Sequence, residues 1–317
     1  IDELQSNGEM RPDDNVRGEI ERMHKHFEIS YLPLAISLLA LEQAELPSFL
    51  GSTLRGAIGQ SLLQVDKEAS AFLYRNGESL DTDRNQVVVK PYMIIPPEIC
   101  APRNMIRRGE KINFEFWLFG NASKYAPSLI LALEHIQEFG LGAYRYPFCL
   151  SEVVNSHTQR LIWRNGSVSK LDMSATFIQG FELTKVTGVI IKICTPLRIR
   201  RGGQMVKSLP FMTLIRNIIN RITMIAERYG GWVDRSEAEK LQALAAEVCT
   251  IREELRIEPM VRYSNRTNRK MDFSGLMGEL EYRGDLTPFV PWLYAAQRLH
   301  IGRNTTFGMG KIRVYFI

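Results

Sequence analysis

Regular alternation of apolar and polar residues marks the first patterned part of the chain. Phe27, Ile29 and Tyr31 alternate with polar neighbours, which is the two-residue period of a half-buried strand. Apolar residues then recur at helical spacing over 51–65, with Leu54 and Ile58 on one stripe. The pattern predicts a strand followed by an amphipathic helix.

The rest of the first half continues this pattern. Strand-like runs at 86–95 and 111–119 precede a helix from Asn121, and the run 144–154 has the composition of a further strand. The predicted order of elements is therefore βαββαβ.

The second half repeats this order. The apolar run Gly188–Ile199 predicts a strand, and apolar residues at helical spacing over 211–225 predict a strongly amphipathic helix. A further helix is expected from Ser236, because Glu239 stands three residues later in a capping box. The remaining predicted elements are strands over 256–264, 273–282 and 310–317 and a helix that opens at Thr287-Pro288.

A short internal match supports a duplication. The segment 139–145 (FGLGAYR) aligns with 307–313 (FGMGKIR), and both stand between the second helix of a βαββαβ unit and its last strand. The sequence therefore predicts an α+β protein of two tandem ferredoxin-like, or RRM-like, domains with a glycine-rich loop near the carboxyl end. The expected domains are 26–155 and 156–317, and residues 1–25 have the composition of a disordered leader.

Composition excludes several classes of protein. The 317 residues are 45% hydrophobic, which is typical of a globular chain, and no run is long and apolar enough for a membrane helix. We therefore expect a cytoplasmic protein without a membrane partner. The four cysteines make no CxxC pair, so they predict buried thiols rather than a zinc site or a disulfide framework.

Positive charge is concentrated in one region. The net charge of the chain is only +5, but the segment 196–231 holds seven cations and one acid. Arg198, Arg200 and Arg201 precede Gly202-Gly203, and this pattern predicts an exposed loop that contacts phosphate. Acidic residues show no spacing that would assemble a metal pair, so no metal and no other cofactor is predicted.

The glycine-rich segment 302–313 (GRNTTFGMGKIR) suits an anionic ligand. Glycine reaches positive φ and lets a ligand approach the backbone, while successive amides in such turns favour anions. In the first copy Ala143 stands where the second has Lys311, so the first copy predicts only a tight turn. The predicted RNA-binding residues are Gly302, Arg303, Asn304, Thr305, Thr306, Gly308, Gly310, Lys311, Arg198, Arg200 and Arg201.

These segments resemble a known family. The carboxyl-terminal loop, the segment 49–64 (FLGSTLRGAIGQSLLQ), the run 139–153 (FGLGAYRYPFCLSEV) and the run 194–203 (CTPLRIRRGG) are similar to the CRISPR-associated RAMP superfamily, specifically its endoribonucleases that process precursor CRISPR RNA. The resemblance covers roughly residues 26–317. It implies tandem ferredoxin-like domains that bind repeat RNA and cut it without metal in antiviral defence.

The implied cleavage uses the 2′-OH of the RNA as nucleophile and leaves a 2′,3′-cyclic phosphate and a 5′-OH. It needs a general base, a general acid and cationic stabilisation of the developing charge. Many relatives carry a histidine on or near the first helix, but the segment 51–65 has none. The candidate catalytic residues are therefore His300, His26 and Arg55.

Two other functions stay open at this point. A catalytically silent RAMP subunit would bind CRISPR RNA within an interference complex, beside other effector subunits. A duplicated ferredoxin-like enzyme would instead bind a small phosphorylated ligand.

Overall fold

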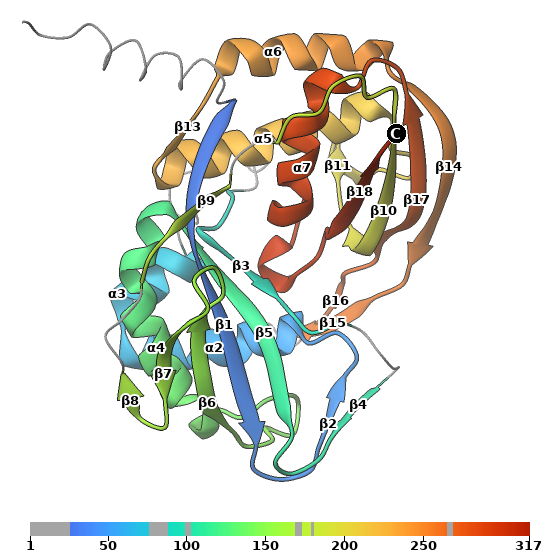
Figure 1. Ribbon diagram of the computed structural model, residues 1–317. Coiled ribbons are helices and arrows are strands. Elements are labelled where there is room, and N and C mark those ends of the chain that lie inside the picture. Colours follow the sequence, from blue (N-terminus) through green and yellow to red (C-terminus); the bar gives the residue numbers. More distant parts are fainter. Residues whose placement is uncertain (1–25, 76–87, 99–102, 169–172, 179–180, 265–268) are drawn as a thin grey trace, which may run out of the picture.

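The computed structural model describes residues 26–75, 88–98, 103–168, 173–178, 181–264 and 269–317, so the predicted leader 1–25 lies outside the described residues. Two βαββαβ units follow one another along the chain (Figure 1). The predicted tandem ferredoxin-like fold is confirmed.

The first unit contains the larger sheet. Its strands β1 (Phe27–Ala40), β3 (Tyr92–Ile95), β5 (Lys111–Phe119) and β6 (Phe148–Asn155) lie in the order β3-β5-β1-β6, which is the ferredoxin-like order. Helices α2 (Gly51–Val65) and α4 (Ala126–Glu134) connect them. The other elements of this region are β2 (Ala44–Pro47), α3 (Lys67–Ser70), the π-helix η1 (Ala71–Arg75), β4 (Arg103–Ile106) and the 3-10 helices η2 (Gly120–Tyr125) and η3 (Ile136–Glu138).

This sheet continues past the boundary predicted between residues 155 and 156. Strands β7 (Arg160–Arg164) and β8 (Ser167–Val168) extend it at the β6 side, and β9 (Thr176–Ile178) pairs with β1. Strand β13 (Gly231–Val233), from the second half of the chain, also pairs with the start of β1. The two halves therefore share a sheet, and the domain boundary itself stays a prediction.

The second unit has the same topology. Strands β10 (Gly188–Leu197), β14 (Cys249–Glu258), β17 (Gly275–Arg283) and β18 (Ile312–Phe316) lie in the order β14-β17-β10-β18. Helix α5 (Phe211–Tyr229) follows β10, and α7 (Val290–Leu299) leads toward β18. The other elements are the hairpin of β11 (Arg200–Arg201) and β12 (Gln204–Met205), helix α6 (Arg235–Leu244), the hairpin of β15 (Val261–Ser264) and β16 (Arg269–Asp272), and the 3-10 helices η4 (Ala245–Glu247), η5 (Thr287–Phe289) and η6 (Thr305–Phe307).

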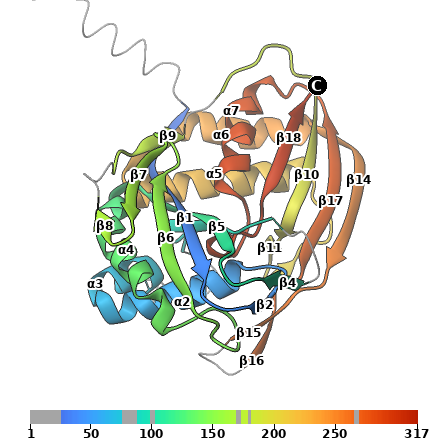
Figure 2. The same ribbon diagram turned by 60° about the horizontal axis from the view of Figure 1, so that its bottom comes forward.

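Strand β1 joins two hydrophobic cores because opposite faces of it are buried along its length. Phe27 and Tyr31 near its start pack with α5 and α7, whereas Leu34 and Leu38 pack under α2 and α4. Side chains of a strand alternate between faces, so one strand supplies both cores. The views in Figures 1 and 2 agree that α2 and α4 cover one side of the first sheet and that α5 and α7 lie toward the second sheet.

Several predicted details are wrong. Helix α6 begins at Arg235 with Asp234 as its cap, since the Asp234 carboxylate accepts from the Glu237 amide, so Ser236 and Glu239 form no capping box at its start. Cys249 is exposed and Cys149 and Cys194 are half-buried, so these three are not buried thiols, while Cys100 lies outside the described residues. Within the described part of the chain, no helix is long and apolar enough to cross a membrane.

Candidate nucleic-acid interface

The glycine-rich loop 302–310 lies between the two halves of the molecule. It contacts β3 and α2 of the first unit through η6. A Cβ built on Gly51, the first residue of α2, would lie 1.7 Å from the Phe307 carbonyl oxygen, and one built on Gly308 would lie 2.2 Å from Cδ of Pro96. The two halves therefore approach each other closely at both glycines, and a side chain at either one would push the halves apart.

The centre of this loop is buried. Thr305, Thr306 and Phe307 are 6%, 8% and 6% exposed, and Met309 is fully buried. Thr195 adds to this packing, because its hydroxyl donates to the Gly308 carbonyl oxygen at 3.0 Å. The structure therefore leaves only the two ends of the loop, residues 302–304 and 311, partly accessible to a ligand. At the second end the Lys311 ammonium lies 3.4 Å from Oε1 of Glu98.

Arg198, Arg200 and Arg303 form a cluster of positive charge at the first of these ends. The Arg303 amide donates to the Arg198 carbonyl oxygen at 2.8 Å. Burial lowers the pKa of the Arg303 guanidinium, and the charges of Arg200 and Arg198 lower it further. Neighbouring guanidiniums that repel one another in this way are stabilised by an anion.

One carboxylate partly offsets the cluster. Oδ2 of Asp272 lies 3.9 Å from Nη1 of Arg198, and the same Nη1 donates to the Ser274 carbonyl oxygen. Arg198 is only 6% exposed. The predicted exposure of Arg198 is therefore wrong. Arg200 and Arg201 lie exposed on the β11–β12 hairpin, as predicted.

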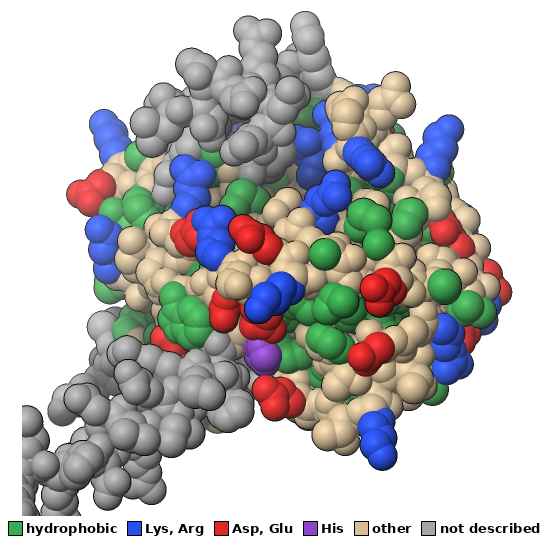
Figure 3. Space-filling model, turned by 90° about the horizontal axis from the view of Figure 1, so that it is seen from above, with side chains coloured by type: hydrophobic (Ala, Val, Ile, Leu, Met, Phe, Trp, Pro, Cys, Tyr) green, Lys and Arg blue, Asp and Glu red, His purple; other side chains and the backbone are tan. Residues whose placement is uncertain are grey.

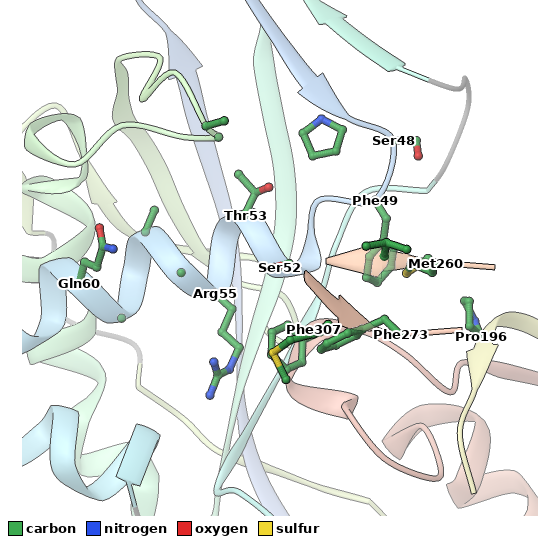
Figure 4. A pocket seen from close by; sticks show the side chains of 18 of the residues that line it. Ser48, Phe49, Ser52, Thr53, Arg55, Gln60, Pro196, Met260, Phe273 and Phe307 are labelled. Atoms are coloured by element: carbon green, nitrogen blue, oxygen red, sulfur yellow. The ribbon is translucent and has the colours of Figure 1, made fainter. Parts of the chain in front are cut away.

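A groove of about 1150 Å³ runs beside the glycine-rich loop. Its walls come from the start of α2, from the loop 139–145, from the strand end at Pro196 and from the base of the β15–β16 hairpin. Phe49, Met260, Phe273 and Phe307 gather at one side of it (Figure 4). The rings of Phe273 and Phe307 meet edge to face with centroids 5.2 Å apart. Such an apolar wall offers aromatic faces to planar groups.

Arg55 projects from α2 toward Phe307 (Figure 4) and contacts both halves of the molecule. Its Nε donates to the Tyr92 hydroxyl at 2.9 Å, and its guanidinium lies 4.6 Å from the ring centroid of Phe307 and 5.0 Å from that of Tyr74. Burial raises the pKa of the Tyr74 and Tyr92 phenols, so both are protonated at neutral pH. Arg55 is thus held by aromatic rings at the edge of the groove.

His300 lies away from the groove. It ends α7 with a positive φ of 54° and is 2% exposed. Burial, followed by the charges of Arg221 and Lys311, lowers its pKa to about 3, and its Nδ1 has no hydrogen-bond partner among the described residues. A neutral imidazole enclosed in this way cannot exchange a proton with a bound RNA.

His26 lies at the start of β1, where its imidazole is held by acids. Its Nδ1 lies 2.6 Å from Oε1 of Glu237 on α6, and its Nε2 lies 3.2 Å from Oε1 of Glu182. The hydrogen bond with Glu237 raises the pKa of His26 more than burial lowers it. The face over α6, seen in Figure 3, mixes acidic, basic and apolar side chains rather than gathering cations. The structure therefore does not bring together the three predicted catalytic residues.

Sequence reasoning missed the aromatic residues of the groove and the loop 139–145. Phe49, Phe273 and Tyr74 are ordinary core-forming types, and no spacing relates them along the chain. Tyr144 did have a signal, since the second copy of the repeat has Ile312 at that position, whereas Arg145 matches Arg313 and gave none. In the described part of the chain, no group of three or more His, Cys, Asp or Glu side chains could hold a metal ion.

Comparison with known proteins places this architecture. Residues 191–312 match the family model of the CRISPR-associated endoribonuclease Cas6, and residues 28–175 match the AF_1859_N model, described as an N-terminal domain. The Cas6 match thus places a Cas6-like, RAMP-type domain in the second half of the chain. None of the curated proteins matches this Cas6-like chain by sequence.

Solved structures share the fold of this Cas6-like chain. A Cas6 product complex is 16% identical with a TM-score of 0.55, and the match covers 90% of this chain and 99% of that one. Thermus thermophilus Cas6 is 13% identical with the same TM-score and coverage. A partial Cas6-RT-Cas1–Cas2 complex gives a TM-score of 0.59 at 12% identity, over 91% of this chain and 46% of that one. At these identities the likeness shows the fold alone.

Proposed function

We propose that this protein binds the repeats of precursor CRISPR RNA along the groove and cleaves them without a metal ion. The observation that supports this most strongly is the groove itself, which has an aromatic wall at Phe273 and Phe307. The arginine cluster adjoins this wall, because the Arg198 guanidinium lies 5.6 Å from the ring centroid of Phe273. RNA offers bases for the wall and phosphates for the guanidiniums. The match to the Cas6 endoribonuclease model supports the same substrate.

The reaction needs only groups that RNA, protein and water supply. The 2′-oxygen attacks the adjacent phosphorus, the bond from phosphorus to the 5′-oxygen breaks, and the 2′-proton leaves while the 5′-oxygen gains one. The products are a 2′,3′-cyclic phosphate and a 5′-OH. Arg55 is our candidate for stabilising the charge that develops on the phosphate oxygens, because its side chain lines the groove.

The acid and base are not the predicted histidines in this proposal. His300 is buried and His26 is held by Glu237 and Glu182, and the described residues that line the groove include no histidine. We propose that solvent supplies the base and the acid. The cleavage rate should then rise with pH and show no inflection near pH 6.5, which an imidazole would cause.

The test is incubation of the purified protein with its repeat RNA in EDTA under single-turnover conditions from pH 6 to 9. We expect cleavage at one position and a product that phosphatase cannot dephosphorylate until acid opens the cyclic ester. Arg55→Ala should abolish cleavage and retain RNA binding. Intact RNA at every pH, with binding retained, would exclude the nuclease.

A catalytically silent RAMP subunit is the second candidate. It is favoured by the same lack of histidine among the described groove residues, and by the packing of Arg55 against Tyr74 and Phe307. Such a subunit would hold CRISPR RNA within an effector complex with other subunits. It predicts tight RNA binding without cleavage in EDTA and in Mg²⁺ alike, whereas the nuclease predicts cleavage in both.

A further inference from the structure

The first copy of the glycine motif forms a rigid turn at the edge of the groove. Leu141 and Tyr146 exchange two backbone hydrogen bonds of 2.8 and 3.0 Å, and the Arg145 amide donates to the Gly142 carbonyl oxygen at 3.2 Å. A Cβ on Gly140 would lie 2.2 Å from the Arg145 carbonyl oxygen. The turn is therefore closed tightly on itself, and its tip is held in one orientation.

Arg145 occupies an unfavourable backbone conformation at this tip. Its φ is 53°, in the left-handed region that glycine and asparagine adopt at lower cost. Its side chain is exposed and lines the groove. An arginine in such a conformation is a feature that turn formation alone does not explain, and it points to a use for the guanidinium.

Tyr144, its neighbour, is the most exposed large hydrophobic side chain in the described part of the chain. It is 81% exposed, and the next most exposed, Val261, is 67% exposed. Its ring meets that of Tyr146 edge to face at a centroid distance of 5.9 Å. The Tyr144 ring thus rests against one aromatic neighbour and otherwise faces solvent at the border of a basic, aromatic groove.

We propose that Tyr144 and Arg145 form a binding point for one unpaired nucleotide of the RNA. The ring of Tyr144 stacks on the base, and the guanidinium of Arg145 pairs with the adjoining phosphate. This inference rests on the proposed binding of RNA in the groove. An unpaired base is required, because only a base outside a duplex presents its face to a side chain.

A protein partner fits these residues less well. One tyrosine on a tight turn offers little area, whereas a stable protein interface buries roughly 800 Å² on each partner. Stacking requires only one aromatic face and one nearby cation, and it costs little backbone entropy because the turn already fixes the backbone.

The probe is an oligouridylate with a single 2-aminopurine, whose fluorescence is quenched by stacking, and a blunt RNA duplex serves as the paired control. Tyr144→Ala should weaken binding of the single strand by about 5- to 150-fold, the range that corresponds to one base stacked on one aromatic ring. It should also remove the quenching. Tyr144→Phe should retain both, because the phenyl ring still stacks.

One control and one further variant separate this proposal from the proposed function. The control, Tyr315→Ala, removes a tyrosine that is 48% exposed on β18, outside the groove, and should leave affinity and quenching unchanged. Arg145→Gly relieves the backbone and removes the cation, so the turn should persist while affinity falls roughly tenfold. One result would overturn this inference alone: Tyr144→Ala leaves binding and quenching unchanged, while Arg200→Ala/Arg303→Ala loses binding. The proposal that RNA binds in the groove would then still stand. No binding of either RNA by the wild-type protein would overturn the proposed function first.

Discussion

The two copies of the glycine motif share a backbone conformation but have opposite surroundings. Gly140 and Gly142 have φ values of 64° and 79°, and their counterparts Gly308 and Gly310 have 84° and 74°. The first copy ends in the exposed Tyr144 and Arg145, whereas the second is buried between the two halves of the molecule. Glycines of similar φ therefore form an exposed tip in one unit and a contact between the halves in the other.

The comparison shows what decides the role of a glycine turn. Positive φ is a local property, which the sequence FGLG or FGMG specifies in both copies. Exposure depends on which segments pack against the turn. The second copy packs against Gly51 and Pro96, which are distant in sequence.

The largest expected effect comes from adding one methyl group at matched positions in the two copies. In Gly310→Ala the new Cβ meets the Ile301 carbonyl oxygen at 1.8 Å, whereas in Gly142→Ala it meets only Cδ2 of Leu46, at 2.9 Å. Both changes carry the cost of positive φ, about 1–2 kcal/mol. We expect Gly310→Ala to cost about 3–5 kcal/mol of unfolding free energy in all, because backbone must move.

Denaturant unfolding of the two variants measures this difference. Gly56→Ala is the matched control on α2, where a Cβ meets nothing within 4 Å and φ is ordinary, and it should be neutral or slightly stabilising. Equal losses for Gly310→Ala and Gly142→Ala would contradict the view that the second copy is the tightly packed one.

Arg55 tests the link between the second copy and α2. Arg55→Met keeps the length of the side chain but removes the hydrogen bond to Tyr92 and the cation over Phe307. We expect a loss of about 1–3 kcal/mol of unfolding free energy. Arg216→Ala, an exposed arginine on α5, should change stability little by the same measurement. Unchanged stability of Arg55→Met would show that the packing around Arg55 does not hold the halves together.

The arginines near the open end of the second copy should affect RNA binding rather than stability. Arg200→Ala/Arg303→Ala removes two guanidiniums from the cluster. The negative slope of log affinity against log salt should therefore become shallower, by roughly 0.7 for each phosphate that the protein no longer neutralises. Fluorescence titration from low to high salt gives this slope. Arg235→Ala removes an arginine paired with Glu227 near α6 and should leave it unchanged. If the wild type, Arg200→Ala/Arg303→Ala and Arg235→Ala all gave the same slope, the cluster would not bind phosphate.

The smallest expected effect concerns pH. Burial lowers the pKa of His300 to about 3 from its ordinary 6.5, so the unfolded chain binds a proton below pH 6.5 that the folded chain does not. His300 therefore favours the folded state above pH 6.5, and this contribution is lost as pH falls toward 3. The difference in unfolding free energy between pH 7 and pH 5 should be smaller in His300→Asn, since the asparagine amide does not titrate.

His300→Asn also separates a structural role from a catalytic one. Its cleavage rate per folded molecule should equal that of the wild type at pH 7.5. A large loss of cleavage with stability retained would return His300 to the active site.

Much of the fold could be predicted because its pattern is local. Helix α5 has an apolar stripe over its full length, and both βαββαβ orders follow from such periodicities. Strand β14 begins at Cys249, seven residues before the predicted start at 256. Its start was missed because β14 lies at the edge of its sheet and most of its side chains are exposed. An edge strand needs no apolar alternation, so the sequence carries little signal for it. Strand β3 begins only at Tyr92, after Pro91, although the apolar run suggested 86–95.

The candidate site was less predictable for a different reason. The predicted arginines 198, 200 and 303 do lie close together, because the backbone of Arg303 bonds to that of Arg198. Burial of the glycine-rich loop and of His300 could not be predicted, since both depend on packing against residues more than 75 positions away, such as Gly51 and Arg221. Residue type indicated which groups suit RNA, and only tertiary packing determined which of them RNA can reach.

The most direct test of RNA binding in the groove is to map where bound RNA touches the protein. RNA that carries 4-thiouridine would be photo-cross-linked to the wild-type protein, and the attached peptides would be identified by mass spectrometry. We expect cross-links around Tyr144, Phe273 and the β11–β12 hairpin, and none at 305–309 or over α6. Cross-links confined to the α6 face, with the groove untouched, would contradict binding in the groove.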